Sequence, residues 1–176
     1  MKKVLASLML AMAATWLLSP LAAQPPMPRP GPEQERLINH WQGNWDCTMN
    51  MMGTEGKGSA VCRPIMGGFF CQMEFKGEFM GTRFDGRSVM GYCPARKCYQ
   101  STWIDSMSPS LTIMNGKYTD DKTYVEEGEG PNMEGKLEKM KSVTTFVDAD
   151  TIEMNMYKIE GEKEEKTMTL VFKRKK

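Results

Sequence analysis

Cysteine and methionine are the residues of this sequence best suited to redox or metal chemistry, with 5 and 18 copies respectively. In "GYCPARKCYQ", Cys93 and Cys98 stand five positions apart around Pro94. This spacing places them opposite each other across a tight hairpin and predicts a disulfide. Catalytic dithiols usually have two residues between the cysteines and lie at a helix N-terminus, so a redox or metal-binding pair is the weaker interpretation.

The other three cysteines fall on three consecutive predicted strands. A second disulfide is predicted between Cys62 and Cys71 across the short connection "MGG", although the spacing also allows Cys47 to pair with Cys62. The remaining thiol would be a small, buried apolar residue. A zinc site of the three cysteines with His40 would require four ligands to converge and is a remote alternative.

Pairs of methionines with one residue between them occur twice, in "MNMM" and in "MNMY". Residues i and i+2 share one face of a strand, and thioether sulfur suits Cu(I), so a metal site is an alternative prediction. The favoured interpretation is that methionine fills a core or lines an adaptable cavity. The alternative metal ligands are Met49, Met51, Met154 and Met156.

Trp103 and Asp105 share one face of the predicted strand "YQSTWIDS". If that face points inward, Asp105 is a polar anchor in a ligand cavity, with Arg83 as a second anchor. The alternative is that Asp105 caps the turn "DSMSPS". The predicted ligand-binding residues are Trp45, Met49, Phe75, Arg83, Trp103, Asp105 and Met154.

Alternating sequence patterns predict the elements that would position these residues. "PEQERLINHWQG" predicts one short amphipathic helix, because proline opens it, acids occupy its first turn and glycine ends it. After it, helical periodicity disappears, and about ten short segments of alternating residues are separated by turns. We therefore predict an all-β protein, an antiparallel sandwich or closed barrel with one N-terminal helix.

The N-terminus predicts export. Lys2 and Lys3 precede an apolar run from Val4 to Leu18, and "SPLAA" offers a cleavage site before Gln24. We predict a signal peptide at 1–23, a Pro-rich disordered tether at 24–32 and a single domain at 33–176. After cleavage we expect a periplasmic or secreted protein with no stable membrane insertion. Cleavage removes two of the 23 basic residues and none of the 22 acidic ones, so the net charge becomes −1 and no nucleic-acid partner is expected.

Several sequence blocks resemble a bacterial family known only as domain of unknown function fifteen seventy-nine. They include "GNWDCTMNM", "IMGGFFCQMEFKGEFMG", "FDGRSVMGY" and "STWIDSMSPSL", and the resemblance spans about residues 33–173. It implies a lipocalin-like β-barrel related to the calycins, which open with Gly-x-Trp on the first strand, as in Gly43-Asn44-Trp45. The helix would close one end of this barrel. The family has no established reaction and so implies no catalytic residues.

The single histidine, His40, limits the cofactors and reactions that this barrel could support. Haem-carrying relatives of the calycins use an axial histidine late in the chain, so histidine-ligated haem is disfavoured, while Tyr, Cys or Met ligation stays open. No G-x-S-x-G, H-E-x-x-H or P-loop pattern is present. We therefore expect no catalytic residue and no resident cofactor.

The combined prediction is an exported barrel that binds a small apolar ligand in its interior. An envelope protein that handles Cu(I) through methionines and a free cysteine is the first alternative. A purely structural envelope protein is the second. The sequence leaves the oligomeric state open.

Overall fold

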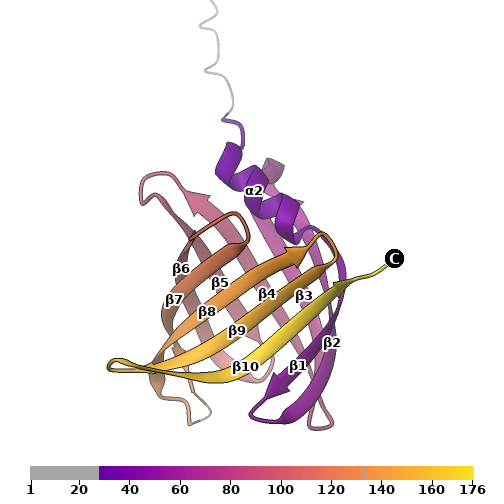
Figure 1. The fold of residues 1–176 in the computed structure, drawn as a ribbon, viewed down its shortest axis with the longest axis vertical. Coiled ribbons are helices and arrows are strands. Elements are labelled where there is room, and N and C mark those ends of the chain that lie inside the picture. Colours follow the sequence, from indigo (N-terminus) through magenta and orange to yellow (C-terminus); the bar gives the residue numbers. More distant parts are fainter. Residues whose placement is uncertain (1–27, 133) are drawn as a thin grey trace, which may run out of the picture.

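The computed structural model describes residues 28–132 and 134–176. The predicted signal peptide and residues 24–27 of the predicted tether lie outside these residues and remain predictions. The described chain forms helix α2 followed by ten strands, with a short 3₁₀ turn, η2, between the second and third strands (Figure 1). The elements are α2 (Pro32–Trp41), β1 (Gly43–Met51), β2 (Thr54–Ile65), η2 (Met66–Gly68), β3 (Phe70–Phe79), β4 (Thr82–Cys93), β5 (Cys98–Asp105), β6 (Ser108–Tyr118), β7 (Thr123–Pro131), β8 (Leu137–Asp148), β9 (Thr151–Glu160) and β10 (Lys163–Arg174).

The ten strands form one closed barrel, which confirms the predicted all-β class and strand number. Each strand pairs with the next along the chain, and β1 pairs with β10 to close the sheet. All the pairs are antiparallel; for example, Trp45 of β1 lies opposite Arg174 of β10. Closure leaves no strand edge exposed to another chain.

Helix α2 lies across one end of the barrel (Figure 1). Pro32 occupies its first turn, and the side chain of Gln34 accepts a 2.9 Å hydrogen bond from the backbone N–H of Gly31. The apolar face of the helix points into the barrel, where Leu37 and Trp41 are fully buried. None of the described helices is long and apolar enough to cross a membrane.

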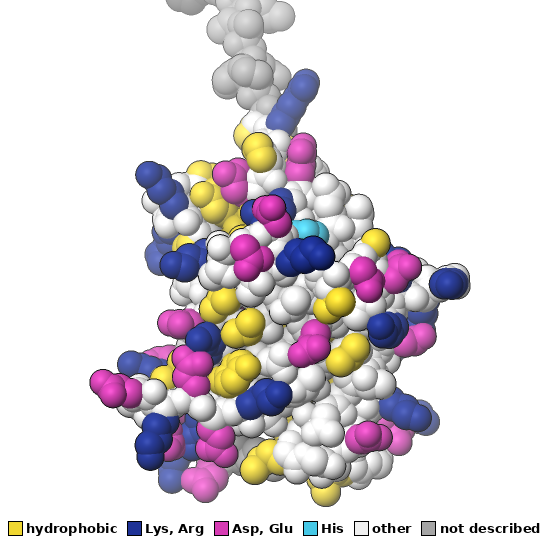
Figure 2. Space-filling view, viewed as in Figure 1, with side chains coloured by type: hydrophobic (Ala, Val, Ile, Leu, Met, Phe, Trp, Pro, Cys, Tyr) yellow, Lys and Arg dark blue, Asp and Glu magenta, His cyan; other side chains and the backbone are white. Residues whose placement is uncertain are grey.

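Inward and outward side chains alternate along the strands. On β1, Trp45, Cys47 and Met49 are buried, while Asp46 and Thr48 are exposed. The outward positions carry charges of both signs, which Figure 2 shows interspersed with apolar side chains on one face of the molecule. Several inward side chains are only half-buried against the core along the whole barrel. Tyr92 and Tyr118 are near α2, Phe84, Trp103 and Met168 are nearer the opposite end, and Met154 and Met156 lie between them.

Gly86 and Gly116 lie inside regular strands. The strand register continues through both positions without a shift. Both glycines make room for a neighbouring side chain. A Cβ atom on Gly86 would lie 2.3 Å from the ring of Trp103, which covers it.

Candidate functional site in the barrel interior

Strand β7 carries a carboxyl group into the barrel. Its alternation points Tyr124 and Glu126 inward and leaves Glu127 exposed. Glu126 is 6% exposed and Tyr124 is 1% exposed. Among the described residues, Glu126 is the one buried side chain of the types Asp, Glu, Lys and Arg. Its Oε1 accepts a 2.8 Å hydrogen bond from the Tyr124 hydroxyl.

The neighbouring strand leaves space for this pair. Gly116 of β6 lies directly opposite Glu126. A Cβ atom at Gly116 would lie 2.6 Å from Cγ of Glu126 and 2.8 Å from the Tyr124 hydroxyl oxygen. The carboxyl and phenol side chains therefore occupy volume that any other residue at 116 would fill.

Burial shifts the protonation equilibria of this pair. Loss of solvation raises the pKa of Glu126, although the hydroxyls of Ser101 and Tyr124 favour its ionised form. The pKa of Tyr124 is also raised, first by burial and then by the nearby Glu126 carboxyl. The site therefore holds an acidic group whose charge no buried cation of the described chain offsets.

Two orphaned hydroxyls lie beside the acid. On β8, Ser142 lies opposite Glu126, and Thr144 lies opposite Tyr124. Both side chains are buried, at 2% and 0% exposure. Neither Oγ of Ser142 nor Oγ1 of Thr144 has a hydrogen-bond partner among the described residues. Because an unpaired buried hydroxyl is unfavourable, these groups are available to a bound molecule.

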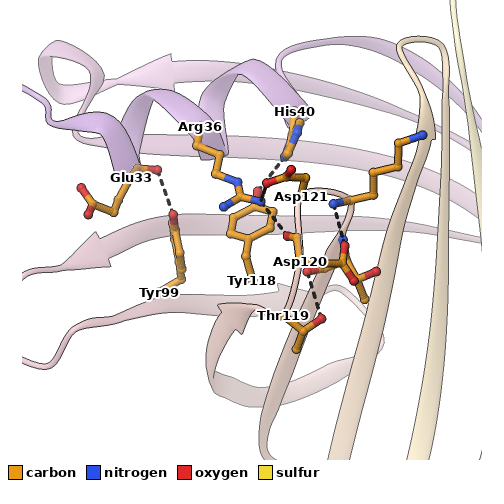
Figure 3. A network of polar contacts seen from close by, with 10 residues as sticks. Glu33, Arg36, His40, Tyr99, Tyr118, Thr119, Asp120 and Asp121 are labelled. Carbon is orange, nitrogen blue, oxygen red and sulfur yellow. Dashed lines mark hydrogen bonds and ion pairs between the residues drawn. The ribbon is translucent and has the colours of Figure 1, made fainter.

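A polar and aromatic network joins this site to helix α2, where Glu33, Arg36 and His40 face Tyr99, Tyr118 and Asp120 (Figure 3). Nδ1 of His40 and the Tyr118 hydroxyl are 2.8 Å apart, within hydrogen-bonding distance. The Tyr99 hydroxyl donates to the Glu33 carbonyl at 3.2 Å. The centre of the Tyr118 ring lies 5.0 Å from that of Tyr124. The helix and the acid therefore belong to one continuous cluster.

Arg36 holds the helix to the loop between β6 and β7. It donates a 2.7 Å hydrogen bond to the Asp120 carbonyl, and its guanidinium carbon lies 3.8 Å from the centre of the Tyr118 ring. Burial first, and then the charge of Arg36, lower the pKa of His40. His40 also stacks on Phe146 with ring centres 4.0 Å apart. The neutral form of His40 is therefore favoured, and its ring packs between helix α2 and the strands of the barrel.

Among residues 28–132 and 134–176, no three His, Cys, Asp or Glu side chains are placed to hold a metal ion. The remote zinc alternative, which combined three cysteines with His40, therefore finds no support in the described geometry.

The predicted apolar wall residues point inward. Trp45 is fully buried, but it closes the helix end: its indole N–H donates to the Trp41 carbonyl at 2.9 Å, and Arg174 covers its ring at 4.1 Å. Met49 and Phe75 are also buried, further along β1 and β3 from the end that α2 covers. Met154 is half-buried against the core.

Trp103 and Asp105 interact near the end of the barrel opposite α2. The Trp103 indole N–H donates a 2.7 Å hydrogen bond to Oδ2 of Asp105. The other oxygen, Oδ1, accepts from the backbone N–H groups of Met107 and Ser108 at 2.8 and 3.0 Å. Asp105 thus caps the turn, as one of the two alternatives predicted, and also orients an inward tryptophan, while its role as an anchor for a ligand stays a prediction.

The predicted anchor Arg83 is not in the interior. Its side chain is 90% exposed and lies 3.6 Å from Glu78, outside the barrel. The prediction was wrong because Arg83 occupies an outward position of β4, one residue before the inward Phe84. The cation that was expected to balance an interior carboxylate is therefore absent from that position.

All five cysteines are free thiols, so neither predicted disulfide is formed. Cys62 lies opposite Met73, and Cys71 lies opposite Pro64. The two cysteines are therefore diagonal neighbours, whose separation of about 7–8 Å exceeds that of a disulfide. Cys93 and Cys98 do lie opposite each other, as expected, but their sulfurs are not bonded.

The structure groups the methionines differently from the sequence. Met51 of β1 lies opposite Met168 of β10, which lies opposite Met156 of β9. Leu170 separates Met49 from Met154 in the next row. Three thioethers from three adjacent strands therefore stand side by side, and Met168 was missed because its run, "KTMTLVF", contains no second methionine.

Two hollows open on the outside of the molecule. One, of about 320 Å³, lies between α2 and β2 and includes Pro30, Ile38 and Pro64 among its lining residues. The other, of about 180 Å³, includes Thr48, Lys57 and Val171 on the outer wall. Neither includes Glu126 or the orphaned hydroxyls in its lining.

Sequence reasoning missed the central acid. The segment "KTYVEEGEG" predicts a strand, but "EEGEGPNMEGK" also reads as a solvated acidic loop, and β7 extends to Pro131 and includes the first half of that run. The alternation of Tyr124 and Glu126 against Val125 and Glu127 was the available signal. It was hidden because both residues of the Glu126–Glu127 pair are acidic, so charge alone does not distinguish the two faces.

Comparisons place the chain in a family. It matches the family described as "Protein of unknown function (DUF1579)" over residues 29–174. No curated protein matches it. Its fold is similar to that of Rv2717c from M. tuberculosis (12% identity, TM-score 0.58, covering 83% of this chain and 99% of that one). It is also similar to S-type phycobiliprotein lyase CPES from Guillardia theta (11% identity, TM-score 0.54, 84% and 99% covered). Because the family match spans α2 and all ten strands, the chain belongs to the DUF1579 family.

Proposed function

We propose that this protein is exported and binds a small, largely apolar molecule inside the barrel, reached from the end opposite α2. The observation that carries this proposal is the buried Glu126 beside two orphaned hydroxyls, Ser142 and Thr144, in an interior whose large side chains are apolar or aromatic. Ligand sites combine apolar walls with a few convergent polar groups in this way. The similarity to solved barrels concerns the fold alone and does not indicate which ligand this chain binds.

Access is proposed at the end opposite α2. Trp103 and Met168 face inward toward that end and are half-buried, as are Met154 and Met156 along β9. The opposite end is closed by α2, whose Leu37 and Trp41 fill it. Methionine side chains are unbranched and adapt their shape readily, so a ligand can displace them without unfolding a strand.

A fluorescent probe tests interior binding. N-phenyl-1-naphthylamine is a neutral apolar fluorophore that brightens on leaving water, and we expect saturable brightening with the purified protein. Met156→Lys places a charge at the inward position and should weaken binding about tenfold or more, because burying a charge is unfavourable. Tyr157→Lys places the same charge on the outer face and should leave affinity unchanged. Equal affinities for the two variants, both still folded by circular dichroism, would place the probe outside the barrel and end the proposal.

Export is proposed from the N-terminal sequence. Cell fractionation with intact-mass measurement tests it, and we expect a periplasmic or secreted chain that begins at Gln24. A cytoplasmic chain that retains residues 1–23 would contradict export without affecting interior binding.

Cu(I) handling is the second candidate, favoured by the adjacent thioethers of Met51, Met156 and Met168. Anaerobic Cu(I) titration against a coloured chelator should then show one tight site, which the triple Met-to-Leu variant at these positions loses. The matched control replaces three exposed methionines, Met52, Met80 and Met107. Equal Cu(I) affinity of both variants would reject this candidate.

A further inference from the structure

The buried acid of β7 has partners that donate hydrogen bonds but none that carries positive charge. Tyr124 donates to Oε1 of Glu126, and the Ser101 hydroxyl acts on the same carboxyl group. Within residues 28–132 and 134–176, no lysine or arginine is buried in the barrel. A carboxylate in such a place is stable when a bound cation neutralises it.

Glu126 and the hydroxyl groups near it can accept the hydrogen bonds that an ammonium group donates. A protonated primary amine donates three hydrogen bonds and needs three acceptors. Glu126 provides at least one, and Ser142 on the facing strand provides another that is otherwise unused. Thr144, one inward position further along β8, provides the third. All three lie on one inward surface formed by two adjacent strands.

Aromatic and thioether side chains surround these acceptors. Tyr124 is the nearest member of a cluster with Tyr99 and Tyr118, whose ring centres lie 5.5 and 5.0 Å from its own. Ring faces attract cations. On the other side, Met156 lies opposite Ser142, and Met154 lies opposite Thr144. The interior therefore changes from acidic and aromatic to apolar across two strands.

We propose that Glu126, with Ser142 and Thr144, receives the protonated nitrogen of a small organic amine whose apolar body lies against Met154 and Met156. This inference rests on the proposed interior binding and names its ligand class. An anionic head group is repelled by the ionised form of Glu126, and a neutral hydroxyl lacks the charge that would compensate the buried carboxylate.

Three probes with the same chain and different head groups test this inference: octylamine, 1-octanol and octanoate. Their ability to displace N-phenyl-1-naphthylamine from the purified protein is measured. We expect octylamine to bind about tenfold more tightly than 1-octanol, since a charge-assisted hydrogen bond strengthens binding by about that factor. Octanoate should bind more weakly than either.

Matched variants assign the preference to its residues. Glu126→Gln should abolish the preference for octylamine, whereas Glu127→Gln on the exposed face of the same strand should retain it. Ser142→Ala and Thr144→Val should each weaken octylamine several-fold while leaving 1-octanol unchanged. Because these two variants remove only unpaired hydroxyls, we expect them to fold, and they test the inference even if Glu126→Gln does not fold.

The outcomes separate this inference from the function on which it rests. Probe binding without any head-group preference, or with a preference that survives both Ser142→Ala and Thr144→Val, means that water alone occupies the polar cluster and overturns this inference. If neither the fluorophore nor any of the three probes binds, interior binding itself fails and this inference fails with it.

Discussion

The Tyr124 hydroxyl donates a 2.8 Å hydrogen bond to Oε1 of Glu126, two residues along the same strand. Both side chains point into the barrel and both are buried. The ring of Tyr124 also packs against that of Tyr118, and the Tyr118 hydroxyl lies 2.8 Å from Nδ1 of His40 in helix α2. One strand thus connects the only buried acid of the described chain to the helix that closes the barrel.

Replacing Glu126 should change how stability depends on pH. Its pKa is raised by burial, so between its ordinary value of 4.5 and its folded value the unfolded chain holds fewer protons. The free energy of unfolding should therefore fall as pH rises through this interval. Urea unfolding of Glu126→Gln should lack this decline and give a more stable protein at high pH. Glu127→Gln serves as the control, and parallel pH profiles for wild type and Glu126→Gln would contradict the assignment.

Gly116→Ala should destabilise the barrel. The new methyl group would lie 2.6 Å from Cγ of Glu126 and 2.7 Å from the carbonyl oxygen of Val125, and the backbone atom cannot move aside easily. We expect a loss of about 1–3 kcal/mol in the free energy of unfolding, as for other overpacked sites. Lys117→Ala, at the next, exposed position, should change it by less than about 0.5 kcal/mol. Similar values for both variants in denaturant unfolding would show that Gly116 is not tightly covered.

Acid should loosen helix α2. The pKa of His40 is lowered by burial and by Arg36, so stability from the neutral imidazole is fully present above pH 6.5 and is lost as pH falls through the lower folded pKa. The groups that face His40 are Tyr118, Phe146 and Arg36. Amide hydrogen exchange of residues 33–41, corrected for intrinsic rates, should accelerate below pH 6.5. His40→Gln should show no such step, and a step that persists there would assign the effect to another group.

The cysteines should fall into two reactivity classes. Burial raises the pKa of Cys47 and of Cys71 to about 12 and also raises that of Cys62, so these thiols carry little thiolate at neutral pH. Cys93 and Cys98 are only half-buried. Iodoacetamide labelling of the reduced, folded protein, followed by peptide mass spectrometry, should modify these two first. Denatured protein provides the control, and uniform rates in the folded protein would contradict the burial of the other three.

Much of the architecture could be predicted because it depends on local patterns. Pro32, the acids that follow it and the end of the apolar periodicity identify helix α2, while two-residue alternation identifies the strands and the inward face of β1. Alternation also placed Trp103 on the inward face, and the turn after it predicted Asp105 as a cap. These features require information only from residues a few positions apart.

The site itself depended on the pairing of strands. Sequence determined that β7 carries a tyrosine and acids in alternation, but only the closed sheet decided that Glu126 faces Gly116 on one side and Ser142 on the other. Register likewise set Cys62 and Cys71 diagonally apart and aligned Met168 with Met51 and Met156. The physical reason is that a side chain's face follows from local geometry, whereas its cross-strand neighbours are chosen by hydrogen bonding between segments far apart in the chain.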